Sequence, residues 1–205
     1  MKNLFLLILL FSLVSCVSNA KKIDNYGNPQ KALLVIDMQI DYVDENGKFP
    51  IEINQINNLI ETINTIIDEF QKSDYNIIYI RNNFRKNDIR NIFRNYAVIE
   101  GTSGVEIHPR INIVSENIFD KYSPSALSNN DLENYLIQNQ INELFLCGVM
   151  ADVNECVGQT ALDALNKGYM VNYIGNAVGS SSLKNIEKAI DNLKKRGIKI
   201  IVLTS

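Results

Sequence analysis

Apolar and polar positions follow two patterns that alternate along the chain. Short, mainly apolar runs of four to six residues predict strands buried inside a sheet. These runs occupy residues 32–37, 76–80, 117–120, 144–149, 170–174 and 199–203. Between several of them, apolar residues recur at helical spacing, which predicts amphipathic helices. The helical segments are residues 53–70, 131–139, 153–166 and 181–196.

This alternation predicts a single α/β domain, a three-layer αβα fold with a mostly parallel, about six-stranded Rossmann-like sheet. Right-handed crossovers would place helices on both faces, with a switch point near the first strand. With 205 residues, 46% of them hydrophobic, the chain is long enough to bury a sizeable core. A formal net charge of -3 without a basic stripe argues against a nucleic-acid partner.

The N-terminal part of the chain differs from the rest. A basic start at Lys2 and an apolar run too short to span a bilayer predict an export signal. The run ends in Leu13-Val14-Ser15-Cys16, which resembles the lipobox of bacterial lipoproteins, where the signal is cut before the cysteine and its sulfur receives a diacylglycerol. We therefore expect a lipoprotein signal peptide over 1–15, a polar tether over 16–30 and the folded domain over 31–205.

Acyl chains on Cys16 would hold the exported protein on a bacterial cell membrane. The alternatives are an ordinary secretory signal with a coincidental cysteine, or an uncleaved anchor.

Two potentially reactive groups follow predicted strands. Asp37 ends the first apolar run, at the sheet edge where open α/β folds place ligands, although a carboxylate there can also simply cap the next turn. Cys156 lies near the start of the helix expected over 153–166, where unpaired amides and the helix dipole favour the thiolate. Cys147, inside the preceding strand, is expected to be a small buried hydrophobic residue, with a disulfide to Cys156 as the alternative.

The other polar candidates carry weaker signals. Residues 81–94 are basic, which is usual for a solvated face, but in a pocket-forming loop they would attract an anionic substrate. The cations are Arg81, Arg85, Lys86, Arg90 and Arg94. His108 is the only histidine and has no metal-binding spacing, so a catalytic zinc is not expected. Lys121, at a predicted strand end, is by itself as consistent with an ordinary surface residue.

Four segments in a fixed order resemble the isochorismatase-like cysteine hydrolases. The first resembles that family's opening strand with its closing aromatic residue, here Tyr42, and the third and fourth resemble its lysine-bearing segment and cysteine-bearing helix. The segments are ALLVIDMQIDY at 32–42, GTSGVEIHP at 101–109, DKYSPSA at 120–126 and CVGQTALDALNKGY at 156–169. Each is a weak signal alone, but the likeness extends from Lys31 to the C-terminus.

The resemblance implies a catalytic triad of Asp37, Lys121 and Cys156. In that family the cysteine attacks an amide-type carbonyl and forms a thioester. Asp37 would take the thiol proton as general base, and Lys121 would stabilise the thiolate. Backbone amides of Ala151 and Cys156 would form the oxyanion hole, and the resemblance implies a non-proline cis peptide at Met150–Ala151.

The resemblance also outlines a substrate pocket. Gln39, Tyr42 and Tyr122 are expected to contact substrate, and loops around Phe84 and Phe93 would wall the pocket together with neighbouring subunits. We therefore expect a homo-oligomer that cleaves an amide or related C–N bond of a small molecule without metal or cofactor. The metal ligands of the nicotinamidase branch are missing, so nicotinamide is not the expected substrate.

The spacing before the cysteine departs from the family pattern. Six positions usually separate the turn glycine from the cysteine, and counting from Gly148 leads to Asn154. Cys156 therefore requires a two-residue insertion within residues 152–155. If Asn154 took the nucleophile position, the protein would be a catalytically inactive binding protein. A vinyl-ether hydrolase that does not use the cysteine is the remaining alternative.

Overall fold

In the computed structural model, the described residues are 23 and 26–203. They form a six-stranded sheet, parallel throughout, in the order β3-β2-β1-β4-β5-β6. The strands are β1 (Gln30–Ile36), β2 (Asn76–Asn82), β3 (Ile118–Lys121), β4 (Ile141–Val149), β5 (Met170–Gly179) and β6 (Lys199–Ile201). The α/β prediction is confirmed, and each predicted strand is present.

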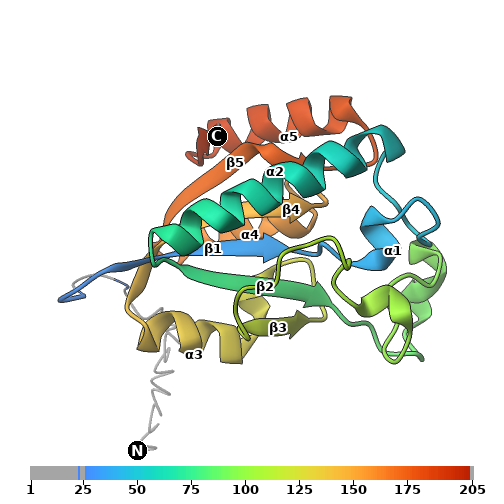
Figure 1. The fold of residues 1–205 in the computed structure, drawn as a ribbon, viewed down its shortest axis with the longest axis horizontal. Coiled ribbons are helices and arrows are strands. Elements are labelled where there is room, and N and C mark those ends of the chain that lie inside the picture. Colours follow the sequence, from blue (N-terminus) through green and yellow to red (C-terminus); the bar gives the residue numbers. More distant parts are fainter. Residues whose placement is uncertain (1–22, 24–25, 204–205) are drawn as a thin grey trace, which may run out of the picture.

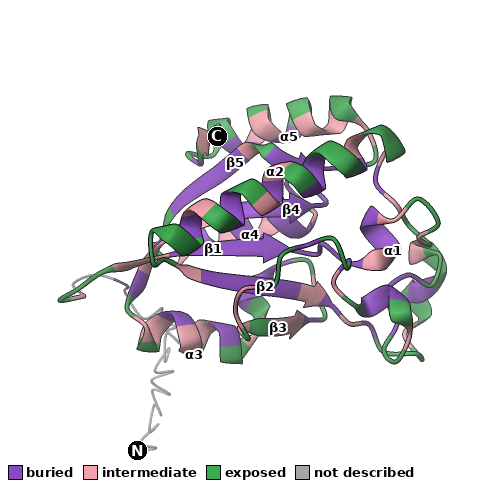
Figure 2. Cartoon of the chain, viewed as in Figure 1, coloured by how far each residue is buried: buried purple, intermediate pink, exposed green. Residues whose placement is uncertain are grey.

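Helices cover both faces of the sheet, as predicted. Figure 1 shows α2 crossing in front of the sheet and α4 behind it, and α5 packs beside α4. The helices are α1 (Ile40–Val43), α2 (Ile53–Lys72), α3 (Asn130–Gln138), α4 (Cys156–Asn166) and α5 (Leu183–Lys195), with 3-10 turns η1 (Ile89–Arg94), η2 (Ser103–Val105) and η3 (Ala126–Ser128). Along α2, buried and exposed stretches alternate because its apolar residues share one face (Figure 2).

The start of α4 differs from the prediction. The helix begins at Cys156 rather than at Val153, because residues 152–155 form a turn. Gly158 allows α4 to lie directly against this turn, since a Cβ there would come within 2.1 Å of the carbonyl oxygen of Asp152. Cys156 is therefore the first residue of the helix.

The predicted signal peptide, residues 1–15, lies outside the described residues. Only part of the predicted tether, 16–30, is described, and that part contacts the domain. Ile23 is buried, and the amide of Asn28 donates to the side chain of Gln140 at 3.2 Å. This part is therefore packed on the domain rather than extended from it, because its apolar residues find core to bury against. No helix within the described part of the chain is both long and apolar enough to cross a bilayer.

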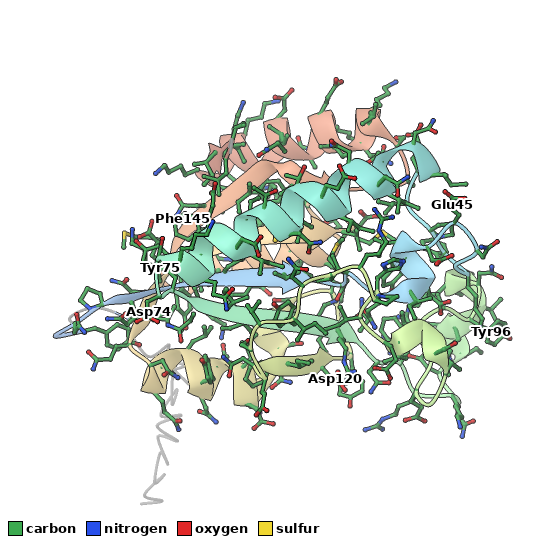
Figure 3. The ribbon with its side chains drawn as sticks, in the orientation of Figure 1. Glu45, Asp74, Tyr75, Tyr96, Asp120 and Phe145 are labelled. Carbon is green, nitrogen blue, oxygen red and sulfur yellow. The ribbon has the colours of Figure 1, made fainter. Side chains whose placement is uncertain are left out.

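The two ends of the sheet are closed differently. At the amino end, Phe70 packs edge-on against Tyr75 and Phe145, with ring centroids 5.5 and 5.0 Å away (Figure 3). At the carboxyl end, α1 and the segment between β2 and β3 gather beyond the strands (Figure 1). This second end is where the polar residues of the predicted site come together.

The carboxyl end contains the switch point of the sheet. β1 lies between β2 and β4. After β2 the chain continues to β3 on one side of β1, and after β4 it continues to β5 on the other side, an arrangement that opens a crevice in folds of this type. Gly148 permits the close pairing of β4 with β1, since a Cβ there would lie 2.0 Å from the carbonyl oxygen of Ile36 and its φ is +126°. On the other side, Asn82 of β2 pairs with Lys121 of β3.

Candidate active site

Asp37, Lys121 and Cys156 meet at the switch point. Asp37 follows β1 with a left-handed φ of 58°, Lys121 ends β3, and Cys156 opens α4. Lys121 Nζ lies 3.0 Å from Asp37 Oδ2, and both side chains are fully buried. Asp37 and Lys121 both act on the pKa of the Cys156 thiol, which places the sulfur in the same cluster. Asn154, the alternative nucleophile position, is exposed instead.

Asn82 connects these three side chains, and sequence reasoning missed it. Its Oδ1 accepts a hydrogen bond from Lys121 Nζ at 2.8 Å, and its Nδ2 donates to Asp37 Oδ2 at 2.7 Å. The same nitrogen lies 3.5 Å from Cys156 Sγ and 3.4 Å from the Tyr42 hydroxyl. The sequence contained a signal for Asn82, because this polar residue follows the apolar run of the second strand, whose end lies beside the end of the first strand.

Three residues were expected to contact substrate, and the structure corrects this expectation for Gln39. Its amide is fully buried and bonded to backbone: Nε2 donates to the carbonyls of Asn82 and Val105, each at 2.7 Å, and Oε1 accepts from the Asn82 amide at 2.8 Å. Gln39 therefore fixes the backbone of Asn82 and has no polar group left for substrate. Tyr42 lies buried beside the site, and Tyr122 is 54% exposed at its rim.

Burial controls the charge of the site. It raises the pKa of the Cys156 thiol to about 12, and Asp37 adds to this effect while Lys121 opposes it. Burial thus opposes the thiolate that the helix start was expected to favour. Burial also raises the pKa of Asp37, although Lys121 and its hydrogen bonds pull it down in part. Burial alone would lower the pKa of Lys121, but the neighbouring Asp37 and Cys156 raise it.

The turn between β4 and α4 supplies the backbone amides. Within the described residues, no hydrogen bond uses the amide of Ala151 or that of Cys156, so both are available to an oxyanion. The prediction of a cis peptide at Met150–Ala151 is wrong, because every peptide bond of the described residues is trans. Met150 instead takes a left-handed φ of 63°, which turns the chain out of β4.

The comparisons with known proteins agree with this arrangement. Residues 31–205 match the family model of the isochorismatase domain. The chain belongs to the isochorismatase family. The uncharacterised family protein YddQ of Bacillus subtilis is 26% identical over 160 residues, which cover 78% of this chain and 83% of that protein.

Two solved structures of the family are amidases. The pyrazinamidase of Pyrococcus horikoshii, in complex with zinc, superposes with a TM-score of 0.76 and 28% identity over 85% of this chain and 100% of that one. The nicotinamidase PncA of Bacillus subtilis superposes with a TM-score of 0.72 and 27% identity, again over 85% of this chain and 100% of that one. This protein is thus an isochorismatase-family hydrolase with amidase-type relatives.

The side chains of this family member do not fit a zinc site. Within the described part of the chain, no cluster of three or more His, Cys, Asp or Glu residues is arranged to hold a metal ion. His108 is engaged elsewhere: Nδ1 accepts from the amide of Arg110 at 3.3 Å, and Nε2 lies 3.6 Å from Asp44 Oδ2.

Proposed function

We propose that this isochorismatase-family hydrolase is a cysteine amidohydrolase that cleaves a small amide or related C–N bond through a thioester on Cys156, without a metal. One observation carries the proposal: the buried Asp37 carboxylate lies 3.0 Å from the Lys121 ammonium, and Asn82 Nδ2 joins it to the thiol, 2.7 Å from Asp37 Oδ2 and 3.5 Å from Cys156 Sγ. The second oxygen of this carboxylate, Oδ1, is buried and has no hydrogen-bond partner within the described residues, so it is free to accept the thiol proton. Nucleophilic catalysis requires such a base beside the nucleophile, held by a fixed counter-charge.

The proton transfer keeps the net charge of the site constant. Before attack, the carboxylate of Asp37 is balanced by the ammonium of Lys121, and the thiol of Cys156 is neutral. As sulfur bonds to the substrate carbonyl, its proton moves to Asp37, so the negative charge passes to the substrate oxygen. At no stage does an uncompensated charge have to be buried, which would cost several kcal/mol.

The later steps use the same groups. The amides of Ala151 and Cys156 stabilise the oxyanion, where the loss of one donor typically costs about 100- to 1000-fold in rate. Protonated Asp37 then gives its proton to the departing nitrogen, and the C–N bond breaks to leave a thioester. Asp37 next takes a proton from water, whose oxygen attacks the thioester and releases the acid and the thiol.

Trapping the covalent intermediate tests this function. A panel of small amides is screened for ammonia release, and active compounds are quenched with acid for intact-mass measurement. We expect an acyl adduct on Cys156 that is missing from Cys156→Ala and Asp37→Asn. Ammonia release that survives Cys156→Ala would contradict the thioester route, and hydrolysis of a vinyl ether by Cys156→Ala, without any amide turnover, would favour the vinyl-ether alternative. Absence of turnover, with iodoacetamide labelling no faster than that of a free thiol, would favour an inactive binding protein.

We also propose that the protein is exported and anchored through acylated Cys16, as the Leu13–Cys16 sequence suggests. Mass spectrometry of the mature N-terminus is expected to find diacylglycerol on Cys16. An intact Met1 in the membrane fraction would contradict this.

A further inference from the structure

In the structure, some cations of the basic run 81–94 form ion pairs and others do not. Arg81 of β2 forms ion pairs with Asp120 at 2.8 Å and Glu106 at 3.2 Å; Asp120, on β3, is labelled in Figure 3. The next three arginines do not share these partners. They lie around a pocket between η1 and the end of β3.

This pocket has a volume of 480 Å³, and its lining residues are Phe84, Arg85, Asn87, Asp88, Arg90 and Tyr122. Two of its wall residues are close in sequence to active-site residues, because Tyr122 directly follows Lys121 and Phe84 is two residues beyond Asn82. At about 3.3 Å per extended residue, the Phe84 wall starts roughly 7 Å along the chain from Asn82. The backbone of Phe84 is fixed there, since its amide donates to the carbonyl of Val98 at 2.9 Å.

The charge around the pocket is positive. Arg90 forms a bidentate pair with Asp88, with its closest nitrogen 2.6 Å from Oδ2, and Arg94 lies 3.6 Å from the same oxygen. Arg94 also stacks on the wall of the pocket, 3.7 Å above the Phe84 ring. The charged lining residues are therefore Arg85, Arg90 and Asp88, a net charge of +1, and Arg94 adds a further positive charge over the Phe84 ring.

Arg85 is the only arginine of this basic run without an ion-pair partner among the described residues. Within the described residues, its guanidinium makes no ion pair, and it is exposed at the lining of the pocket. A guanidinium presents a planar fork of donors that matches a carboxylate, and Phe84 and Tyr122 line the same pocket.

We propose that this pocket binds a carboxylate carried by the substrate, with Arg85 as its contact and Phe84 and Tyr122 as its walls. The substrate class is then an amide with a carboxylate at its far end. This inference rests on the proposed function, because it assigns the pocket to the part of the amide that is not cleaved.

The test measures binding rather than turnover. The catalytically inert Cys156→Ala protein is titrated calorimetrically with malonamate, succinamate and glutaramate, and with the neutral methyl ester of each. These amides differ only in the number of methylenes between the two ends. We expect at least one acid to bind about tenfold or more tightly than its ester.

Two variants in that background assign the preference to Arg85. Arg85→Gln is expected to bring acid and ester within about twofold of each other. Lys86→Gln removes the same charge from the next residue, but Lys86 Nζ lies beside Gly101 and outside the lining, so the preference should remain. Equal binding of every acid and its ester, or a preference that survives Arg85→Gln, would overturn the proposal. A preserved preference in a protein that releases no ammonia would refute the amidase function alone.

Discussion

Cys147 and Cys156 lie in one continuous segment, and both are buried, yet their surroundings differ. Cys147 sits within β4 with its sulfur 3.6 Å from the carbonyl oxygen of Leu34, and burial alone raises its pKa. Cys156 is nearly as buried but has Asp37 and Lys121 beside it. No disulfide joins the two thiols, so that alternative was wrong. We therefore expect a reactive thiol only at Cys156, where a carboxylate that can accept its proton lies in the same cluster.

Alanine substitution of each cysteine gives the largest expected difference. Cys156→Ala removes the nucleophile and should lower kcat by about four orders of magnitude or more for any amide that the protein hydrolyses. Cys147→Ala should leave kcat/KM within about threefold, since no catalytic group contacts its sulfur. Ammonia release under single-substrate conditions measures both. Comparable losses in the two variants would contradict the distinction drawn here.

The charged pair that separates the two environments should be visible in stability. Lys121→Met leaves the Asp37 carboxylate buried without its counter-ion, which typically costs about 3–5 kcal/mol in the free energy of unfolding. The double variant Asp37→Asn with Lys121→Met removes both charges and should recover a large part of that loss. Urea denaturation measures each free energy. A double variant less stable than Lys121→Met would argue against a buried ion pair.

Asn82 should tune the acid side of the pH profile. Asp37 must be ionised to accept the thiol proton, so kcat/KM falls as the pH drops through its pKa. Because burial raises that pKa, the acid limb should lie above the ordinary carboxyl value of about 4. Asn82→Ala removes a donor that lowers the pKa, so the limb should move further up and the rate should fall about 10- to 100-fold.

Asn83→Ala is the matched control for that variant. Asn83 is the adjacent amide, but its Nδ2 donates to Asp120 Oδ2 at 2.9 Å, away from the three site residues. Its acid limb should coincide with that of the unchanged protein. An identical shift in both variants would show that Asn82 acts through the stability of β2 and not through Asp37.

Local patterns were sufficient for the fold and for part of the site. The apolar runs gave every strand, and the residues that directly follow a strand or open a helix gave Asp37 and Cys156. Lys121 needed the family resemblance, because a lysine at a strand end is ordinary. Asn82 needed the strand register, since its neighbour Lys121 lies 39 positions further along the chain.

The other wrong predictions concern features that depend on packing between segments distant in sequence. Gln39 follows a buried strand, yet its side chain turns inward because its backbone bridges to Ile107 across the crevice. The thiolate expected at Cys156 relied on a helix start, but the cover supplied by other elements excludes water and raises the thiol pKa. The direction of a side chain and the dielectric around it depend on segments far away in sequence.

The smallest expected effect concerns the stability contributed by the inert thiol. Cys147→Ala removes one sulfur from a fully buried position and should lower the free energy of unfolding by about 1–2 kcal/mol, the range for a small buried apolar deletion. Cys156→Ala should cost no more than this, because the position is slightly exposed, at 9%. Urea midpoints with equal m-values measure the difference. If Cys156→Ala were more destabilising than Cys147→Ala by several kcal/mol, the Cys156 side chain would act chiefly as a structural link between Asp37 and α4. The loss of activity in Cys156→Ala would then have to be corrected for the loss of folded protein before it is attributed to the missing nucleophile.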